Sequence, residues 1–202
     1  MTKKNKILLI DFSKVVSPIW ISKYLSERFS TFLNLSKEEI IKIYKSRIWP
    51  LMRWEYSILI SIEDFVPYLK DGYTSGDLFE ASKEIPPLDM NFLEWLQKLR
   101  KEYCVYLTSD IHEVLWERVK KELWNYFDGF IFSYEKKARK SENVFRENLS
   151  IKIDFSKVEL FVDDKEININ LAKKYGIKWL IYNPSDWIGA IFSELNLQII
   201  SI

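Results

Sequence analysis

The chain has 202 residues, of which 48% are hydrophobic and 16% aromatic, so it has enough apolar material for a packed core. Thirty basic and 29 acidic residues give a formal net charge of +1, which argues against a protein that binds nucleic acid through its overall charge. The single cysteine, Cys104, excludes an internal disulfide, and the apolar runs are too short for a membrane helix or a signal peptide. We expect a cytoplasmic protein with neither a membrane nor a nucleic-acid partner, and the sequence leaves its oligomeric state open.

The first predicted element is a β-strand over residues 6–11. Four consecutive apolar residues, 7–10, run directly into the carboxylate of Asp11. A continuous apolar run is typical of a parallel strand that is buried on both faces, and a charge at its end is typical of a strand that leads into a functional site. Asp11 is therefore the first candidate site residue.

Residues 17–85 predict helices without intervening strands. Ser17 followed by Pro18 predicts the start of a first helix, with Ser17 as its N-cap. Ser36 and Glu39 have the spacing of a capping box and predict the start of a second helix. Further helices are expected at about 62–69 and 76–83.

Strands and helices alternate from residue 90 onward. Predicted strands cover about 103–108, 130–132, 158–162 and 178–182, and predicted helices cover about 90–101, 112–125, 141–149, 166–174 and 186–195. This βαβ pattern predicts an α/β fold with a doubly wound, Rossmann-like parallel sheet. Right-handed crossovers then place helices on both faces of the sheet.

Polar residues follow three of these later strands. The candidates are Thr108, Ser109 and Asp110 after one strand, Ser133 with Lys136, Lys137, Arg139 and Lys140 after the next, and Asp163 with Asp164 after the third. Because ligands bind outside the carboxyl ends of the strands in an open parallel sheet, we expect these side chains to converge with Asp11. Carboxylates, hydroxyls and a lysine in one place suit a phosphate group and a divalent metal.

In this order the residues resemble the motifs of the haloacid dehalogenase-like (HAD) hydrolases, and the resemblance covers nearly the whole chain. Softer matches are Pro87-Leu88, Phe127-Asp128-Gly129 and the placing of Ser133 seven residues before Lys140. The spacing after the late acid pair is close to that of the small phosphatases related to the N-terminal domain of soluble epoxide hydrolases. Receiver domains of response regulators use similar residues, but their acidic pair comes first in the chain.

The resemblance implies a role for each candidate. Asp11 would be the nucleophile that attacks phosphorus and forms an aspartyl-phosphate. Lys140 would be the second catalytic residue, and it would hold the substrate phosphate together with Ser109 or its neighbour Thr108. The basic cluster at 136–140 is otherwise a solvated surface, and the seven-residue spacing from Ser133 favours Lys140 as the member that faces the site.

The cofactor that the resemblance implies is Mg²⁺. Its ligands would be Asp11, Asp163 and Asp164, together with the backbone carbonyl of Ser13. Two adjacent acids at the end of an apolar strand are costly unless a cation lies between them, which supports a metal at this place. Asn168, four residues after the pair, is placed to orient these carboxylates.

Three positions depart from the family pattern. Ser13 stands where a second aspartate usually protonates the leaving oxygen, Lys14 stands where a small residue usually follows, and Ser141 stands where proline is common. A positioned proton donor contributes about 10²- to 10⁴-fold in rate, so its absence slows the reaction without removing the rest of the site. We therefore expect a weakened or specialised activity.

Other residues have less specific interpretations. Asp110 is expected to cap the following helix, and His112, the only histidine, is expected to lie on the surface at a helix N-terminus. Trp49, Trp54 and Tyr56 are candidates for substrate contacts.

We predict a HAD-like α/β core, residues 1–16 and 86–202, with an inserted α-helical cap, residues 17–85, that closes over the site. The expected function is that of a Mg²⁺-dependent phosphatase acting on a small phosphorylated metabolite. Ser13 and Lys14 favour one alternative, an inactive relative that binds a phosphorylated ligand or a partner. A HAD hydrolase of other chemistry, such as a dehalogenase, is a second alternative, although dehalogenases do not usually have a metal-binding acid pair.

Overall fold

The computed structural model describes residues 4–53, 55, 57–143, 153–183 and 189–195. Within these residues five strands form one parallel sheet in the order β3-β2-β1-β4-β5. The strands are β1 (Lys6–Asp11), β2 (Tyr103–Ser109), β3 (Gly129–Phe132), β4 (Val158–Asp163) and β5 (Trp179–Ile181). The predicted α/β class and parallel sheet are confirmed, and each predicted strand overlaps an observed one.

The central place of β1 follows from its apolar run. Leu8 and Ile10 pack on one face of the sheet, in what we call the first core cluster, and Ile7 and Leu9 pack on the other face, in the second core cluster. All four side chains are buried. A strand that is apolar on both faces is stable in the middle of a sheet that is covered on both sides.

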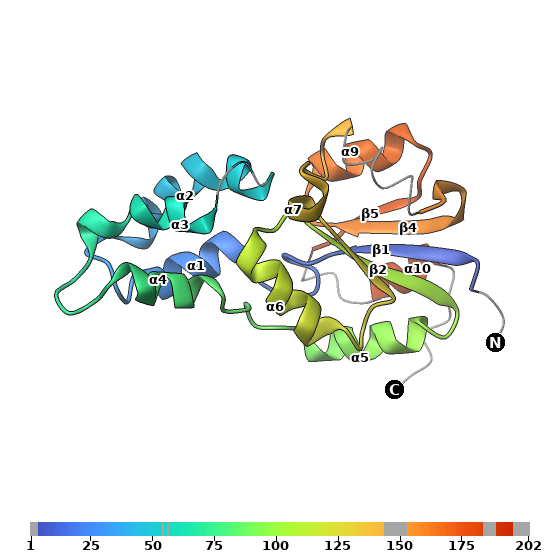
Figure 1. Ribbon diagram of the computed structural model, residues 1–202. Coiled ribbons are helices and arrows are strands. Elements are labelled where there is room, and N and C mark those ends of the chain that lie inside the picture. Colours follow the sequence, from blue (N-terminus) through green and yellow to red (C-terminus); the bar gives the residue numbers. More distant parts are fainter. Residues whose placement is uncertain (1–3, 54, 56, 144–152, 184–188, 196–202) are drawn as a thin grey trace.

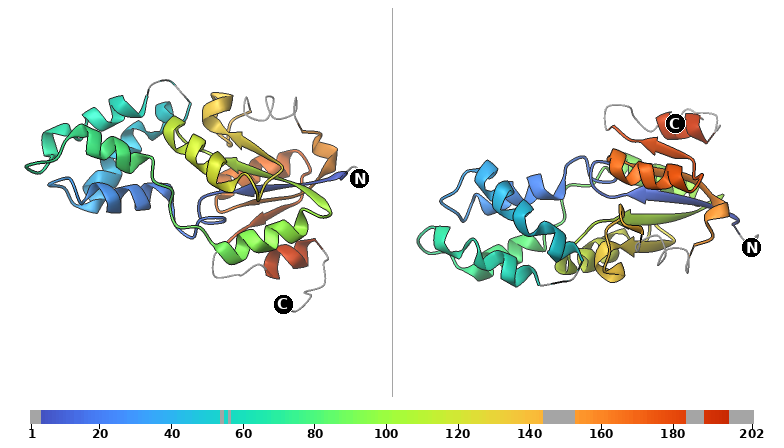
Figure 2. Two further views of the ribbon diagram at one scale, coloured as in Figure 1. Left: turned by 60° about the horizontal axis from the view of Figure 1, so that its bottom comes forward. Right: turned by 90° about the horizontal axis from the view of Figure 1, so that it is seen from above.

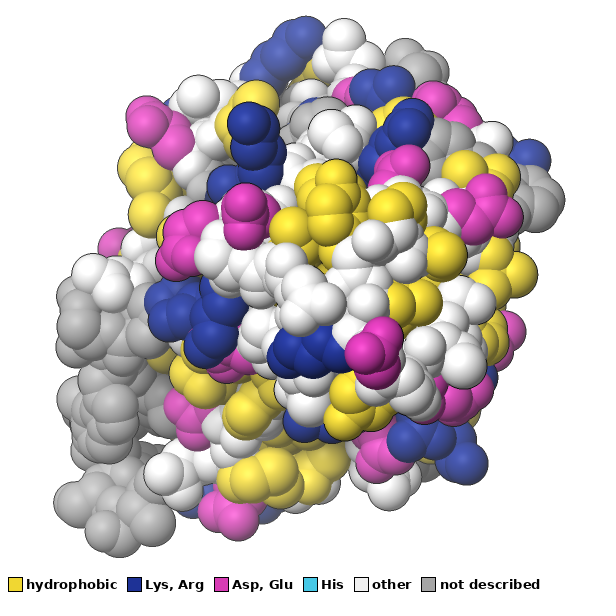
Figure 3. All heavy atoms as spheres, turned by 90° about the vertical axis from the view of Figure 1, so that its left-hand side faces the viewer, with side chains coloured by type: hydrophobic (Ala, Val, Ile, Leu, Met, Phe, Trp, Pro, Cys, Tyr) yellow, Lys and Arg dark blue, Asp and Glu magenta, His cyan; other side chains and the backbone are white. Residues whose placement is uncertain are grey.

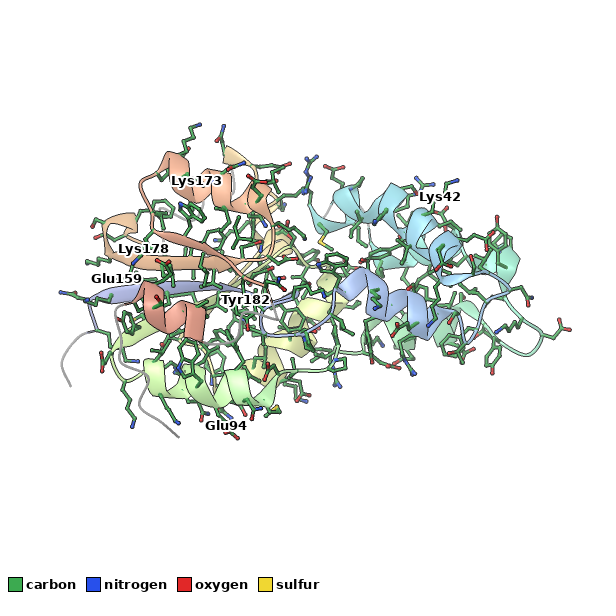
Figure 4. All side chains as sticks on the ribbon, turned by 180° about the vertical axis from the view of Figure 1, so that it is seen from behind. Lys42, Glu94, Glu159, Lys173, Lys178 and Tyr182 are labelled. Atoms are coloured by element: carbon green, nitrogen blue, oxygen red, sulfur yellow. The ribbon has the colours of Figure 1, made fainter. Side chains whose placement is uncertain are left out.

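Helices cover both faces of the sheet (Figure 1). The core helices are α5 (Met90–Leu99), α6 (Glu113–Leu123), α9 (Glu166–Lys174) and α10 (Gly189–Glu194), with short turns at α7 (Ser133–Lys136) and η2 (Phe155–Lys157). Buried residues of α5, α6 and α10 belong to the first core cluster, and those of α9 belong to the second. In Figure 4, Glu94 on α5 and Lys173 on α9 lie on opposite sides of the sheet.

These core helices confirm most of the predicted ones. The predicted helices at 90–101, 112–125 and 166–174 correspond to α5, α6 and α9, and the end of the predicted helix at 186–195 corresponds to α10. Most of the predicted helix at 141–149 lies outside the described residues. α5 shows the physical basis: Asp89 at its N-cap accepts a hydrogen bond from the backbone N–H of Phe92 at 3.0 Å, and its apolar residues recur at helical spacing.

The strand order places the candidate residues at one edge of the sheet. From β1 the chain adds β2 and β3 on one side, and then adds β4 and β5 on the other side. The neighbouring carboxyl ends of β1 and β4 therefore flank the point where the winding reverses, which is where open α/β sheets bind ligands. Asp11 ends β1, Asp163 ends β4, and Thr108 lies opposite Asp11 in the register with β2.

The segment between β1 and α5 forms a helical bundle beyond the carboxyl ends of the strands (Figures 1 and 2). Its elements are α1 (Ile21–Phe29), α2 (Lys37–Met52), α3 (Ile58–Glu63), η1 (Val66–Tyr68) and α4 (Ser75–Ser82). We call this bundle the insertion. The capping box of α2 is confirmed, because Ser36 N–H donates to Glu39 Oε2 at 2.8 Å and Glu39 N–H donates to Ser36 Oγ at 3.2 Å.

Two predicted helix starts in the insertion are wrong. α1 begins at Ile21 with Trp20 as its N-cap, because the Ser17 hydroxyl is used in a turn, where it donates to the carbonyl of Ile19 at 3.2 Å. α3 begins at Ile58, and Ser57 caps it by accepting from the N–H of Leu59. The predicted helix at 62–69 is therefore replaced by the end of α3 and the turn η1.

The outer end of the insertion has a mixed surface. Figure 3 shows basic and acidic side chains interspersed on this face, with apolar side chains between them. Leu59, Ile60 and Val66 are among the exposed apolar residues of this segment. None of the helices within the described residues is long and apolar enough to span a membrane.

Candidate active site

Three of the predicted site residues form a buried, charged cluster, which we call the strand-end cluster. Lys140 Nζ donates to Asp11 Oδ1 at 2.5 Å and to Asp163 Oδ2 at 2.6 Å. The side chains of Lys140, Asp11 and Asp163 are 3%, 2% and 0% exposed. Hydrogen bonds between charged groups are the strong ones, and burial strengthens them further. The cluster thus joins the ends of β1 and β4 to the segment that follows α7.

The segment before Lys140 is held in a fixed place. The backbone N–H of Lys140 donates to Asp110 Oδ1 at 2.9 Å. Ser133 Oγ, buried at the start of α7, accepts from the N–H of Ile111 at 3.0 Å. Asp110 therefore does not cap α6 as predicted, since His112 occupies the N-cap position. Its carboxylate binds the lysine loop instead, which aligns that loop with the end of β2.

The four members of the basic cluster have different surroundings. Lys140 is buried, Lys136 and Arg139 are partly buried, and Lys137 is exposed. Lys137 has a φ of +52° and its N–H bonds back to the last turn of α7, so the chain leaves the helix there and turns inward. Lys140 is thus the member of this cluster that reaches the strand ends.

The two acids at the end of β4 have separate partners. Asp163 accepts from Lys165 N–H at 2.9 Å, and Asn168 Nδ2 donates to both of its oxygens at 3.0 Å. The expectation that Asn168 orients the acids is confirmed for Asp163. Asp164 Oδ2 accepts from the indole Nε1 of Trp20 at 2.7 Å, a contact from the start of the insertion that the sequence did not predict.

The acids can hold a divalent cation. Asp11, Asp163 and Asp164 each offer a carboxylate oxygen, and these oxygens lie within 4.8 Å of one another. Asp11 Oδ2 and Asp164 Oδ1 are buried and have no hydrogen-bond partner among the described residues. With Lys140 as the counter-charge, three carboxylates leave a formal excess of two negative charges, and hard oxygen ligands with this charge suit Mg²⁺.

Burial raises the pKa of the Asp11 carboxyl well above its usual value, and the charge of Asp163 raises it further, while Lys140 opposes the change. A bound cation would lower that pKa. Burial alone would lower the pKa of the Lys140 ammonium, but Asp11 and Asp163 outweigh burial and raise it, so Lys140 stays charged. Without a bound cation, burial therefore disfavours the charged form of Asp11, while Lys140 keeps its charge.

A pocket of about 440 Å³ adjoins this cluster. Ser13, Asp110 and Lys165 line it from the core, and Lys45, Ile48 and Met52 of α2 line it from the insertion. Trp20, Ile21 and Ser22 complete the lining at the start of α1. We call this space the insertion pocket. It is large enough for a small organic molecule.

Comparison with known proteins bears on this arrangement. No family model matches the chain, and no curated protein does. The HAD family enzyme bt-2542 from Bacteroides thetaiotaomicron, solved with magnesium and inorganic phosphate, has 22% identity and a TM-score of 0.74, over 92% of this chain and 98% of that chain. This chain has the HAD-like fold. The predicted resemblance is thereby confirmed at the level of the fold.

Two further solved structures share the HAD-like fold. A predicted HAD-like family hydrolase from Porphyromonas gingivalis has 17% identity and a TM-score of 0.73, over 97% of this chain and 100% of that chain. The L-2-haloacid dehalogenase from Xanthobacter autotrophicus has 13% identity and a TM-score of 0.63, over 86% of this chain and 76% of that chain. Because one fold can host different reactions, the fold alone does not assign the chemistry of this site, and its residues must be considered.

The hydroxyl candidates lie beside the cluster. Thr108 is buried, and its Oγ1 donates to the carbonyl of Ile10 at 3.4 Å. Ser109 is buried at the last position of β2. Both residues stand at the strand ends where a phosphate would lie, and their role as phosphate ligands stays a prediction.

Two of the three residues that depart from the family pattern, Ser13 and Lys14, lie between the cluster and the insertion. Ser13 lines the insertion pocket. Lys14 has a φ of +65°, in the left-handed region that favours glycine, and its ammonium lies 5.2 Å from the ring centroid of Trp20. The turn therefore keeps the conformation that a small residue would adopt more easily, and the lysine side chain points toward the insertion.

The interpretation of His112 as a surface residue is wrong. It is at the N-cap of α6 as expected of a helix N-terminus, but its side chain is 0% exposed. Neither ring nitrogen has a hydrogen-bond partner among the described residues, and burial lowers the pKa of His112 to about 4. Trp54 and Tyr56, and the side chain of Trp49, lie outside the described residues.

Proposed function

We propose that this protein is a Mg²⁺-dependent phosphatase that acts on a small phosphorylated metabolite through an aspartyl-phosphate at Asp11. The observation that carries the proposal is the unequal pairing of the two Asp11 oxygens. Oδ1 is bonded to Lys140, whereas Oδ2 is buried without a partner among the described residues, beside Asp163 and Asp164. An oriented carboxylate with one free oxygen is suited to nucleophilic attack.

The residues divide the reaction between them. Asp11 Oδ2 attacks phosphorus, the bond from phosphorus to the leaving oxygen breaks, and that oxygen departs with the electron pair. Lys140 keeps Asp11 oriented and neutralises negative charge in the transition state. Water then attacks the aspartyl-phosphate, which releases phosphate and restores Asp11. Held by Asp11, Asp163 and Asp164, Mg²⁺ would supply charge neutralisation for the phosphoryl group.

Ser13 makes the proposed activity selective for good leaving groups. A serine hydroxyl is too weak an acid to protonate a departing alkoxide, so the leaving group must depart as an anion. The rate should then fall steeply as the leaving group becomes more basic. Aryl and acyl phosphates are the expected substrates, and alkyl and sugar phosphates should react slowly. Entry of the substrate under the helical insertion, as a cap, is part of this proposal.

The first experiment measures phosphate release with and without Mg²⁺ from an aryl and an alkyl phosphate. Asp11→Asn should abolish release, and Asp71→Asn, the same substitution at an exposed position of the insertion, should leave it unchanged. Release by Asp11→Asn at the wild-type rate would contradict the proposed nucleophile.

The second experiment restores the missing acid. Ser13→Asp should raise kcat/KM for the alkyl phosphate by about 10-fold to 10³-fold and change it less for the aryl phosphate. The double variant with Lys14→Gly controls for the shape of the turn. If the wild-type protein cleaves both substrates equally fast, another proton donor is present.

Two alternatives each rest on one observation. The unusual pair Ser13 and Lys14 favours a protein that binds a phosphorylated ligand without turnover. This alternative is supported if phosphate binds but neither the wild-type protein nor any variant releases phosphate from the esters. The fold similarity to the Xanthobacter dehalogenase favours halide release instead. The acid pair at the end of β4 argues for phosphate, and a halide-release assay with a 2-haloacid distinguishes the two chemistries.

A further inference from the structure

We infer that the insertion pocket selects phosphate monoesters whose organic part is apolar and carries a second negative group, which Lys45 binds. This inference rests on the proposed function, because it takes Asp11 as the place where the phosphate is held. It adds a substrate class and a specificity residue that lie outside the strand-end cluster.

The core side of the pocket connects directly to that cluster. Ser13 follows Asp11 by two residues, and Asp110 is hydrogen-bonded to the backbone of Lys140. Lys165 follows the acid pair directly, and its backbone N–H donates to Asp163 Oδ1 at 2.9 Å, so it is tied to the same strand end. A phosphate at Asp11 would therefore have its ester oxygen directed into this pocket.

The insertion side of the pocket supplies apolar surface. Ile48 and Met52 lie on α2, and Ile21 lies at the start of α1. Trp20 is 49% exposed even though its indole nitrogen is bonded to Asp164, so much of its ring remains uncovered. Ile21 and Met52 are themselves only 5% and 3% exposed, so an apolar or aromatic group would cover chiefly Trp20 and Ile48, and would gain the free energy of removing those surfaces from water.

Lys45 adds a positive charge to this apolar wall. It is exposed on α2 and lines the pocket together with Ile48 and Met52, which follow it at helical spacing on the same side of the helix. Lys45 makes no ion pair within the described part of the chain, whereas Arg47, two residues later on α2, is paired with Asp64 at 2.7 Å. An unpaired ammonium beside a phosphate site is positioned for a second anionic group of the same ligand.

The size of the pocket favours a small molecule over a macromolecular partner. A volume of about 440 Å³ lies within the range of small-molecule sites, and inorganic phosphate alone would leave most of it empty. A phosphate ester of an aromatic carboxylic acid has three matching features. Its phosphate would lie at Asp11, its flat apolar body would cover the apolar wall, and its distal anion would pair with Lys45.

Binding of phosphonates, which cannot be hydrolysed, tests this inference apart from catalysis. Methylphosphonate, phenylphosphonate and 4-carboxyphenylphosphonate would be titrated by calorimetry in the presence of Mg²⁺. The phenyl compound should bind about tenfold more tightly than the methyl compound, because it covers the apolar wall. The carboxylate should add a further factor of about 3 to 5, because it pairs with Lys45.

Matched variants assign these gains to residues. Lys45→Gln should remove the gain from the carboxylate and leave the gain from the phenyl ring. Lys42→Gln is the control, because Lys42 is an exposed lysine on the same helix that does not line the pocket, and Figure 4 shows it on the outer surface of the insertion. Ile48→Ser should reduce the phenyl gain, because Ile48 is partly exposed in the pocket wall, whereas Met52 is already buried.

The outcomes separate the inference from the proposed function. Equal affinity for the methyl and phenyl compounds, or an unchanged carboxylate gain in Lys45→Gln, would overturn the inference even if phosphate esters are hydrolysed. If the phosphonates bind in the expected order but the matching phosphate esters are not hydrolysed, the phosphatase function is overturned and the inference about the pocket is supported. Failure of every phosphonate to bind would overturn both.

Discussion

The strand-end cluster and the wall of the insertion pocket use charge in opposite ways. Lys140 in the cluster is 3% exposed and is bonded to two carboxylates, whereas Lys45 in the pocket wall is exposed and has no ion pair among the described residues. Buried charges must be paired to be tolerated, but an exposed charge costs little when it is left alone. A buried, paired lysine and an exposed lysine without an ion pair among the described residues thus lie in neighbouring regions.

Polar contacts join the insertion, which carries the pocket wall, to the core, which carries the strand-end cluster. The indole of Trp20 donates to Asp164, the guanidinium of Arg53 pairs with Glu142, and Ser57 Oγ donates to Glu113 Oε1 at 2.7 Å. Each contact joins the insertion to an acid of the core. Partly exposed contacts of this kind are weak enough to break and re-form. They are therefore expected to be weaker than the buried ion pairs of Lys140 with Asp11 and Asp163.

The largest expected difference between the regions is in stability. Lys140→Ala leaves Asp11 and Asp163 buried together without their shared counter-charge, so the free energy of unfolding should fall by about 3 to 5 kcal/mol in EDTA. Lys45→Ala should change it by less than about 0.5 kcal/mol. Urea unfolding measures both. Adding Mg²⁺ should restore part of the loss in Lys140→Ala, and equal losses in the two variants would contradict the contrast.

The sequence predicted the cluster better than the insertion. The run 7–10 ends at Asp11 because a strand buried on both faces must be apolar, and the strand order then brings Asp163 beside it. An apolar run that ends in an acid can be recognised in the sequence, and the alternation of strands and helices indicates which strand ends come together. Lys140 needed a spacing argument, since the sequence of a basic cluster does not show which member turns inward.

Details of the insertion, and of the start of α6 in the core, were harder to predict because side chains there make contacts that local sequence patterns do not show. Ser17 has the side chain of a helix cap but is used in a turn, so α1 starts later than predicted. His112 was expected at the surface because histidine is polar, and only the packing of α6 shows that it is buried. The bond from Trp20 to Asp164 spans 144 positions and has no local signal.

The pH dependence of stability should come partly from His112. Burial lowers its pKa from 6.5 to about 4, so between these values the folded state binds fewer protons than the unfolded state. The contribution of His112 to the free energy of unfolding is fully present above about pH 6.5. It is lost as the pH falls toward 4, by about 3 kcal/mol in total. In His112→Leu, which lacks the titrating ring, the free energy of unfolding should change less between pH 6.5 and 4 than in the wild-type protein. The carboxylates titrate in both proteins, so the difference between the two profiles reports on His112. Parallel profiles would show that His112 does not titrate differently on folding.

The hydrogen bond from Trp20 to Asp164 should affect the affinity for Mg²⁺. Trp20 binds Asp164 Oδ2 and leaves Oδ1 without a partner, so it orients the carboxylate for a cation. Trp20→Phe should weaken Mg²⁺ binding about fivefold, as expected for losing a partly exposed hydrogen bond of about 1 kcal/mol to a charged group. Calorimetry with Mg²⁺ measures this change. Trp124→Phe, at a tryptophan that is 63% exposed, is the control and should bind Mg²⁺ as the wild-type protein does.

The smallest expected effect is at Lys14, where the chain passes from the cluster to the insertion. Its φ of +65° costs an ordinary side chain about 1 to 2 kcal/mol, and glycine avoids that cost but loses more freedom on folding. Lys14→Gly should therefore be more stable than Lys14→Ala by about 0.5 kcal/mol, since both variants lose the contact with Trp20 and differ only in backbone preference. At Glu94, an exposed position inside α5, the order should reverse, with glycine less stable than alanine by about 1 kcal/mol. Chemical denaturation of the four variants measures both differences. The same order at both positions would show that the turn after β1 is not held in the left-handed conformation, and that the link between the two regions is looser than the structure indicates.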